Sequence, residues 1–373
     1  MTVTEIRVHL PGPPLVPATG GDRSYVIRCG SGLLSGVGPA VRAVGGRRAV
    51  VVADAAVAGS HAARVAESLQ AAGIETARFE MPRGERSKSV ASAAQLWNAF
   101  AEAAVDRGTH VVAVGGGVVG DLAGFVAATF ARGLPLWHVP TTLVAQVDSA
   151  IGGKTGINLD AGKNLVGGFW QPVGVFSDVD TLATLPAREF VSGFAEVVKY
   201  GVIFDPDLFA WLADHAAGLL ARDPAVLTQA IARSAALKAA VVERDERELS
   251  GERAALNYGH TFAHAFEASA GYGTLLHGEA VAIGMARAAR LARLLGRIDD
   301  ALVARQDRLL GSFGLPITTA VAGPLAADHL LTLMARDKKT LDGRLRFVLP
   351  SRLGHVEIVD GVPAAAVREA LAG

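Results

Sequence analysis

The sequence predicts an α/β protein with two domains: a mostly parallel sheet covered by helices over residues 1–185, and a mostly α-helical domain over residues 186–373. Three observations support this fold class. A chain of 373 residues is long enough for about two hydrophobic cores. The first half alternates short β-branched runs with amphipathic helical segments, as repeated β-α-β units do. From about residue 186 onward the pattern of apolar residues is almost wholly helical.

The elements of the first half follow from the period of their apolar residues. Residues 1–21 are rich in proline and glycine and predict a loosely held lead-in. Strands are predicted at residues 24–30, 47–54, 75–82, 110–117 and, as a strand end, 137–140. Helices are predicted at residues 60–72, 85–107 and 122–133. This order indicates an open, Rossmann-like sheet, whose ligands bind beyond the carboxyl ends of the strands.

The second half carries helix-start signals as well as helical periodicity. Asp205 and Asp223 are each followed by proline, which is typical of the residue that begins a helix. Helices are predicted at residues 205–221, 223–246 and 278–296, and two short strands at residues 345–350 and 355–359.

Composition narrows the class of function. The chain has 36 basic and 36 acidic residues, so no overall charge favours nucleic acid or a membrane surface as a partner. Its single cysteine, Cys29, excludes an intrachain disulfide framework and fits a reducing cytosol. The N-terminus lacks the pattern of a signal peptide, and no run of about 18 apolar residues without charges predicts a membrane span. We therefore expect a cytoplasmic protein.

A glycine-rich segment, GGGVVGD at residues 115–121, follows a predicted strand and leads into a predicted helix. Gly115, Gly117 and Gly120 satisfy the pattern G-x-G-x-x-G. Glycines let the backbone approach a pyrophosphate, and the helix N-terminus supplies unpaired N–H groups. The motif comes late in the sheet, and no acid follows about 20 residues later. The sequence thus predicts a nucleotide-binding loop, but not the standard dinucleotide fold.

Polar residues near other strand ends are further candidates. Asp54 follows a predicted strand, and Glu85 and Lys88 lie in the segment PRGERSK. They are candidate contacts to the ribose or adenine of a nucleotide, with solvated loop charges as the alternative. Residues 137–172 form a long polar stretch, and a loop of that length is uncommon in a compact domain unless it is functional. Its lysines and asparagines lie beside glycines, which suits a phosphate or sugar-phosphate pocket.

Histidines in residues 257–279 predict a metal site. His260 and His264 are four residues apart, so they lie on one side of a helix, and His277 follows soon after. Imidazoles spaced this way hold divalent metals, although solvated histidines are the alternative. No Glu follows His260, so HExxH protease chemistry is not supported. Glu196 lies among apolar residues and could complete a site of two His and one acid; a surface pair with Lys199 is the alternative.

Several segments, in the same order along the chain, resemble 3-dehydroquinate synthases of the sugar-phosphate cyclase family. They are GGGVVGDLAGFVAATFARG, VPTTLVAQVDSAIGGKTGIN, GKNLVGGFWQP, DTLATLP, GFAEVVKYG, LNYGHTFAHAFE, LLHGEAVAIGM and DKK. The resemblance implies conversion of 3-deoxy-D-arabino-heptulosonate 7-phosphate to 3-dehydroquinate and phosphate, the second step of the shikimate pathway to chorismate and the aromatic amino acids. It also implies a tightly held NAD, a divalent zinc or cobalt ion, and a homodimer.

The resemblance carries roles to individual residues. Glu196, His260 and His277 would be the metal ligands, which moves His264 to the substrate side. The residues implied for NAD are Asp54, Glu85, Lys88, Gly115, Gly116, Gly117, Asp121, Thr141, Thr142, Asp148, Lys154, Lys163, Thr181 and Leu182. Those implied for the substrate phosphate are Lys154, Asn164, Lys199 and one of Lys338 and Lys339. Lys238, Arg253 and Asn257 would hold the substrate's carboxylate and hydroxyls, and Arg132 would reach into a neighbouring subunit's site.

The implied chemistry suits these residue types. Transient oxidation of the C5 hydroxyl by NAD acidifies the adjacent C–H, and phosphate then leaves by β-elimination. Reduction of the ketone, ring opening and intramolecular aldol closure give the carbocycle. The chain departs from the family pattern at Tyr258 and Ala263, where Phe and Gly are expected, and by one extra residue before Arg253. The first departure could shift packing behind His260 without removing a ligand.

Alternative functions remain open. A cyclase acting on sedoheptulose 7-phosphate would not need Lys238 and Arg253, because that sugar has no carboxylate; an amino-dehydroquinate synthase, whose substrate keeps the carboxylate, would need both. A metal-dependent alcohol dehydrogenase shares the two-domain plan but would accumulate NADH. A nucleotide-binding protein without catalytic activity is opposed by the presence of Lys154 and of all three implied metal ligands.

Overall fold

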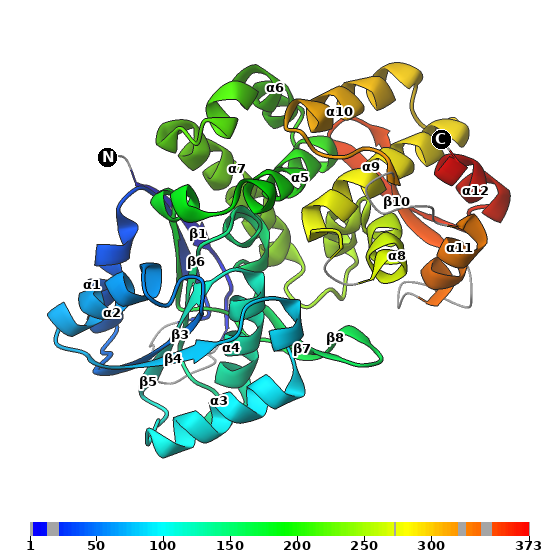
Figure 1. The fold of residues 1–373 in the computed structure, drawn as a ribbon. Helices are drawn as coiled ribbons and strands as arrows, with labels where there is room; N and C mark the ends of the chain where they lie inside the picture. Colours follow the sequence, from blue (N-terminus) through cyan, green and yellow to red (C-terminus); the bar gives the residue numbers. More distant parts are fainter. Residues whose placement is uncertain (1–2, 13–21, 272–273, 320–325, 337–344, 373) are drawn as a thin grey trace. The chain divides into compact units, whose positions relative to one another are not determined.

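The computed structural model describes residues 3–12, 22–271, 274–319, 326–336 and 345–372 (Figure 1). The chain divides into two compact units. The sheet unit comprises Met1–Leu185 and Leu227–Arg247, and the helical unit comprises Pro186–Val226 and Glu248–Gly373. A parallel-sheet region followed by a helical region confirms the predicted fold class.

Seven strands form the main sheet, in the order β1-β2-β9-β6-β5-β3-β4. Their bounds are β1 Thr4–Val8, β2 Tyr25–Gly30, β3 Arg48–Asp54, β4 Glu75–Met81, β5 Thr109–Gly115, β6 Leu136–Pro140 and β9 Gly174–Asp178. All neighbouring pairs are parallel except β1 and β2, which are antiparallel. The strand β1 corrects the predicted loose lead-in, because Ile6 pairs with Ile27 at the edge of the sheet.

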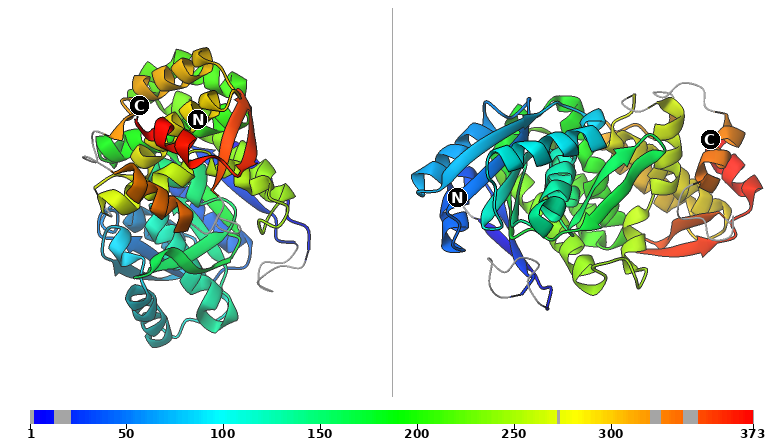
Figure 2. Two further views of the ribbon diagram at one scale, coloured as in Figure 1. Left: turned by 90° about the vertical axis from the view of Figure 1, so that its right-hand side faces the viewer. Right: turned by 90° about the horizontal axis from the view of Figure 1, so that it is seen from below.

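Helices cover both faces of this sheet (Figures 1 and 2). The helices of the sheet unit are α1 Val37–Ala43, α2 His61–Ala71, α3 Val90–Glu102, α4 Gly117–Thr129 and α7 Pro224–Arg244. Val51 of β3 packs in an apolar cluster with α1 and α2, whereas Val50 and Val52 pack with α3 and α4. A strand buried on both faces explains the continuous run of valines. Because β3 and β5 are neighbours while the helices that follow them lie on opposite faces, their carboxyl ends mark the switch point where open sheets bind ligands.

The predicted polar loop at residues 137–172 is ordered as separate elements. After β6 comes a π-helical turn, Ala145–Ser149, and then an antiparallel hairpin of β7 (Lys154–Leu159) and β8 (Gly162–Phe169). The hairpin escaped prediction because its many glycines leave no alternation of apolar and polar side chains.

The helix α7 groups with the sheet unit, although its sequence lies in the part predicted as the helical domain. Its Lys238 Nζ donates to Asp148 Oδ1 at 2.6 Å, and Glu246, just beyond its end, pairs with Arg23 at 2.6 Å. Helical periodicity does not indicate which core a helix joins. Among the described residues, α7 alone is long and apolar enough to cross a membrane, and 56% of its apolar window is buried inside the protein, as in a core helix.

The helical unit contains most of the remaining helices and one small hairpin (Figure 2). Its described helices are α5 Ala187–Ile203, α6 Pro206–Leu220, α8 His260–Ala270, α9 His277–Leu294, α10 Asp300–Ser312, α11 Ala327–Arg336 and α12 Ala364–Ala372. As predicted, Asp205 caps α6, where its side chain accepts from Leu208 N at 2.9 Å. The predicted C-terminal strands are confirmed as the antiparallel pair β10 (Arg346–Arg352) and β11 (His355–Asp360).

Candidate functional site

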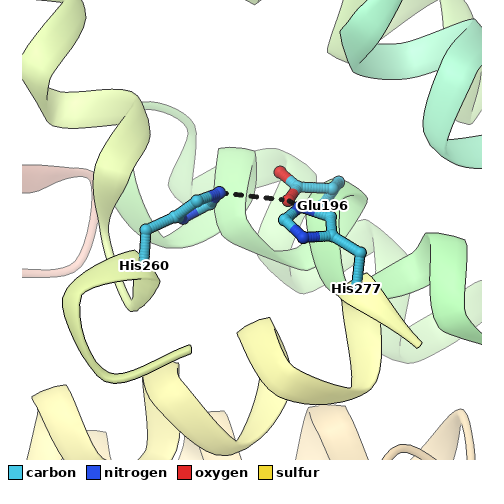
Figure 3. Close-up of side chains that lie close together, drawn as sticks. All are labelled: Glu196, His260 and His277. Atoms are coloured by element: carbon cyan, nitrogen blue, oxygen red, sulfur yellow. Dashed lines mark ion pairs between the residues drawn. The ribbon is translucent and has the colours of Figure 1, made fainter. Parts of the chain in front are cut away.

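Three residues predicted as metal ligands converge in the helical unit (Figure 3). Glu196 lies in the middle of α5, while His260 and His277 are the first residues of α8 and α9. Each residue offers a ligand atom, and these atoms lie within 4.8 Å of one another. The Glu196 Oε1 atom is 3.3 Å from His277 Nε2 and 3.7 Å from His260 Nε2. One ion can therefore reach all three side chains.

The far side of each imidazole also faces a polar group. His260 Nδ1 lies 3.2 Å from the carbonyl oxygen of Tyr258, and His277 Nδ1 lies 3.8 Å from Glu267 Oε1. A partner at one ring nitrogen fixes the ring and leaves the other nitrogen for a metal. Glu267 was not among the predicted site residues. Its position seven residues after His260, on the same side of the helix, was the available signal.

The start of α9 is held against α5, which sets the position of His277. Gly278 N donates to Ser192 Oγ at 3.1 Å. The Glu279 carboxylate accepts from Leu276 N at 2.8 Å and pairs with Arg188 at 2.7 Å. These contacts fix the first turn of the helix that presents the second imidazole.

Two carboxylates and one lysine surround the imidazoles. Glu196 is 0% exposed and forms an ion pair with Lys199, which is 1% exposed. The inward setting predicted for Glu196 is thus confirmed, and the surface pair with Lys199 is excluded. Burial alone would lower the pKa of His277, but the carboxylates of Glu196 and Glu267 raise this pKa to about 10. A donor set of one carboxylate and two imidazoles fits zinc or cobalt.

The other predicted residues of the helical unit lie around this cluster or near its chain segments. His264 is exposed, and its ring centre is 5.7 Å from that of His260, so the pair four residues apart is not the pair that faces Glu196. Arg253 is 1% exposed, with Nε 3.8 Å from Glu248 Oε1, and Asn257 ends the same 3₁₀ turn, Glu252–Asn257. Lys338 and Lys339 lie outside the described residues.

In the sheet unit, the predicted nucleotide loop joins β5 to α4. Gly115 ends β5, Gly116 precedes α4, and Gly117 is its first residue. Thr141, directly after β6, donates its N–H to Gly115 O at 2.9 Å. A Cβ on Gly116 would lie 3.0 Å from the Thr142 methyl carbon, so the loops after β5 and β6 pack together.

Charged residues beside this loop are paired. Lys88, 4% exposed, forms an ion pair with Asp121 of α4. Burial raises the pKa of the Asp121 carboxyl, and Lys88 opposes that rise. Lys238 donates to both the carbonyl and the side chain of Asp148, each at 2.6 Å. All four residues are among those predicted for the cofactor or the substrate, but these pairings join residues far apart in the sequence and leave no local pattern.

A chain of hydrogen bonds links two more predicted residues through one that was not assigned. Asn158 Nδ2 donates to Glu85 Oε1 at 2.7 Å, and Asn158 Oδ1 accepts from Asn164 N at 2.9 Å. Asn158 thus ties the hairpin to the turn after β4. Its role depends on tertiary pairing, which no local pattern indicates.

The remaining predicted residues of the sheet unit differ in setting. Asp54 ends β3, Lys154 begins β7 with an exposed side chain, and Lys163 lies on β8. Thr181 Oγ1 donates to Asp178 O at 2.7 Å, and Leu182 is 0% exposed. Arg132 is exposed after α4, in the left-handed region at φ +69°.

Comparison with known proteins supports the family suggested by the sequence. Two family models match in order: 3-dehydroquinate synthase N-terminal over residues 78–192, and 3-dehydroquinate synthase C-terminal over residues 193–340. A 3-dehydroquinate synthase from Rhodopirellula baltica is 51% identical over 358 residues, covering 94% of this chain and 95% of the relative. One from Geobacter metallireducens is 52% identical over 340 residues, covering 91% and 93%.

Solved structures with the same fold include sister cyclases. A 2-deoxy-scyllo-inosose synthase complexed with carbaglucose-6-phosphate, NAD⁺ and Co²⁺ has a TM-score of 0.85 at 27% identity, covering 94% of this chain and 97% of the other. A 2-epi-5-epi-valiolone synthase from Streptomyces hygroscopicus with NAD⁺ and Zn²⁺ has a TM-score of 0.86 at 28% identity, covering 93% and 96%. A butanol dehydrogenase from Thermotoga maritima, at 17% identity and a TM-score of 0.62, shares the fold alone. With both family models matched and relatives about half identical over nearly its whole length, this chain belongs to the 3-dehydroquinate synthase family.

Proposed function

We propose that this chain is a 3-dehydroquinate synthase. It would convert 3-deoxy-D-arabino-heptulosonate 7-phosphate to 3-dehydroquinate and phosphate by NAD-mediated transient oxidation, phosphate elimination, reduction and intramolecular aldol closure. The observation that carries the proposal is the gathering of Glu196, His260 and His277 within 4.8 Å in a member of this family. The higher identity to 3-dehydroquinate synthases than to the sister cyclases favours the heptulosonate as substrate.

Zinc or cobalt would be held by the same three residues. A bound divalent ion supplies Lewis-acid polarisation of substrate oxygens. Tyr258 and Glu267 act on the far nitrogens of the two imidazoles and keep Nε2 of each toward Glu196. For His264, which is exposed beside His260, we propose a role toward the substrate rather than toward the ion.

NAD would bind at the switch point between β3 and β5 in the sheet unit, which we propose as the NAD-binding domain. Bound NAD supplies a hydride acceptor that is regenerated within each turnover. Gly115–Gly117 let the backbone approach a pyrophosphate at the N-terminus of α4. The other residues proposed for the cofactor are Asp54, Glu85, Lys88, Asp121, Thr141, Thr142, Asp148, Lys154, Lys163, Thr181 and Leu182.

Basic and amide side chains would bind the sugar phosphate. For the phosphate we propose Lys154, Asn164, Lys199 and one of Lys338 and Lys339, because fixed cations stabilise charge on the departing group. Lys238, Arg253 and Asn257 are proposed for the carboxylate and hydroxyls. Lys238 is already bound to Asp148, which would place its ammonium for that contact.

Assembly and location are proposed from the family resemblance. Arg132 stands exposed in a conformation that few residues other than glycine adopt, a feature often found at functional positions. We propose that it serves a neighbouring subunit's site in a homodimer. A cytoplasmic location and a place in the shikimate pathway complete the proposal.

Substrate choice is tested by measuring phosphate release from three sugar phosphates with NAD and Zn²⁺ present. We expect release from the heptulosonate and none from sedoheptulose 7-phosphate, because that sugar offers no carboxylate. Absence of release from the heptulosonate would reject the assignment. Release from its amino analogue alone would instead indicate an amino-dehydroquinate synthase, and net NADH formation would indicate a dehydrogenase.

Metal binding is tested with a pair of neighbouring histidines. His277→Ala should lower zinc content after purification to well below one ion per chain, since it removes one of three ligands. His264→Ala is the matched control, which should keep its zinc and lose turnover. Loss of zinc in the His264 variant, with retention in the His277 variant, would contradict the assigned ligand set.

A further inference from the structure

Tyr258, where the resemblance to the family leads us to expect Phe, carries a buried hydroxyl with two polar neighbours. The residue is 0% exposed, and its hydroxyl donates to Gln306 Oε1 at 2.7 Å. Gln306 is 2% exposed and donates from Nε2 to Met285 O at 3.0 Å. The Tyr258 hydroxyl also lies 3.3 Å from the same carbonyl. The three groups form a small closed network in an apolar interior, where an unpaired hydroxyl or amide is costly.

The main chain of the same tyrosine contacts a proposed metal ligand. Its carbonyl oxygen lies 3.2 Å from His260 Nδ1, and the ring's other nitrogen faces Glu196 at 3.7 Å. A carbonyl at this place selects the imidazole tautomer with hydrogen on Nδ1 and fixes the ring plane. Whatever holds the Tyr258 carbonyl in place therefore holds the ligand.

The segment between the tyrosine and the histidine has little room to move. Gly259 has φ +79°, and a Cβ there would lie 2.8 Å from Met285 N. A Cβ on Gly284 would lie 2.2 Å from Gly259 O. The backbone of the Tyr258–His260 segment thus touches α9, and the tyrosine hydroxyl reaches Gln306 of α10 as well as the Met285 carbonyl of α9.

We propose that Tyr258 and Gln306 are a positioning pair for the metal centre. The hydroxyl–amide bond anchors the Tyr258 ring to α10, the anchored residue holds its carbonyl, and the carbonyl orients His260. This role rests on the proposed function of Glu196, His260 and His277 as metal ligands. A phenylalanine at position 258 would fill the same space but would lack the anchor and leave Gln306 Oε1 without its donor.

The test measures metal affinity apart from catalysis. Metal-free protein is titrated with Co²⁺ against a competing chelator, and the visible absorption of the bound ion reports ligand geometry. Removal of a group that hydrogen-bonds a metal ligand directly typically weakens metal binding 10- to 100-fold. The Tyr258 hydroxyl acts on His260 only indirectly, through the position of the Tyr258 carbonyl. Tyr258→Phe should therefore weaken Co²⁺ binding less, about three- to tenfold, and alter the absorption spectrum of the bound ion. Tyr25→Phe is the matched control, because Tyr25 is 2% exposed and its hydroxyl accepts from Gly152 N at 3.1 Å in the sheet unit.

A double substitution separates positioning from simple loss of stability. Tyr258→Phe combined with Gln306→Leu removes both partners of the bond, so urea stability of the metal-free protein should recover relative to Tyr258→Phe alone. Co²⁺ affinity should remain low, because the anchor is still missing. Recovery of affinity together with stability would overturn the positioning role, as would unchanged affinity and spectrum in Tyr258→Phe. If the unsubstituted protein binds no Co²⁺ or Zn²⁺, the proposed metal centre itself fails, and the positioning role with it.

Discussion

Tyr258 and Gly259, directly before His260, restrict the position of this proposed metal ligand. Gly259 lies between the anchored Tyr258 and the ligand His260, with a left-handed backbone and Met285 in close contact. Two separate costs therefore oppose any side chain at this position: the strain of positive φ and the overlap with main-chain atoms.

Substitution of this glycine gives the first prediction. Gly259→Ala should lower the free energy of unfolding by about 2–4 kcal/mol, which sums about 1 kcal/mol for the left-handed conformation and about 1–3 kcal/mol for the overlap. Gly251→Ala is the matched control, because Gly251 has φ +87° and no atom within 4 Å of its added Cβ. It should cost only about 1 kcal/mol. Urea denaturation measures the loss in the free energy of unfolding for both variants. Equal losses would show that the close contact with Met285 adds nothing to the cost of the substitution.

Local pattern indicated which residue types form the cluster but not which histidines combine. The spacing of His260 and His264 suggested a pair on one helix, because side-chain period is all that a single segment reveals. The structure instead brings together the first residues of two helices, and that pairing depends on how α8 and α9 pack. Only the family resemblance selected His277 over His264 in advance.

At the scale of elements, the strands with a clear apolar pattern were predicted and those without one were missed. The strands β3 and β5 were predicted because buried parallel strands leave uninterrupted apolar runs, and β2 was predicted from its alternation of apolar and polar residues. The strands β1 and β9 were missed. Each is five residues long, and β1 lies in a segment rich in proline and glycine. The register that brings Asp54 and Gly115 to one edge of the sheet is a property of the pairing of β3 with β5.

Two neighbouring strands of the sheet carry buried histidines that are neutral. His110 of β5 is 1% exposed and accepts a hydrogen bond from Trp137 Nε1 at 2.9 Å, and His138 of β6 is 5% exposed. Burial lowers the pKa of each to about 4. Between that value and the unfolded pKa of about 6.5 the unfolded chain binds more protons, so stability falls as the pH falls through this window.

The second prediction concerns this acid sensitivity. His110→Asn keeps an acceptor for Trp137 but cannot be protonated near neutral pH. It should be about 1 kcal/mol less stable than the unsubstituted protein at pH 7.5. At pH 4 it should be about 2 kcal/mol more stable, because the unsubstituted protein loses about 3 kcal/mol by protonation of His110 between these pH values, at about 1.4 kcal/mol per pKa unit. The measurement is urea stability at several pH values between 4 and 7.5. Parallel curves for the two proteins would show that His110 does not titrate on unfolding.

At the scale of the whole molecule, the chain assigns its two proposed cofactors to different units. All residues of the metal cluster lie in the helical unit, and the glycine loop with its paired charges lies in the sheet unit. This division does not follow the order of the sequence. After entering the helical unit, the chain returns to the sheet unit with α7, which brings Lys238 to Asp148. The sequence of an apolar helix does not show which hydrophobic core the helix packs into, so the placement of α7 in the sheet unit could not be predicted.

The last prediction follows from that division. A ligand that binds only the folded state slows local opening of the elements that hold it, by about 100-fold when its free concentration is about 100 times Kd. Zinc added to metal-free protein should therefore slow amide hydrogen exchange most in α5, α8 and the first turn of α9, where Glu196, His260 and His277 reside. NAD should slow exchange most at the end of β5 and the start of α4.

Hydrogen exchange resolved by mass spectrometry distinguishes these patterns in one set of samples. A chelator should reverse the zinc effect and leave the NAD effect in place, while His277→Ala should abolish the zinc effect alone. Because His264→Ala keeps all three proposed ligands, it should retain the zinc effect. Zinc protection centred on β5 and α4, with none at α8 or α9, would place the ion outside the three-residue cluster and contradict the assignment of the metal to the helical unit.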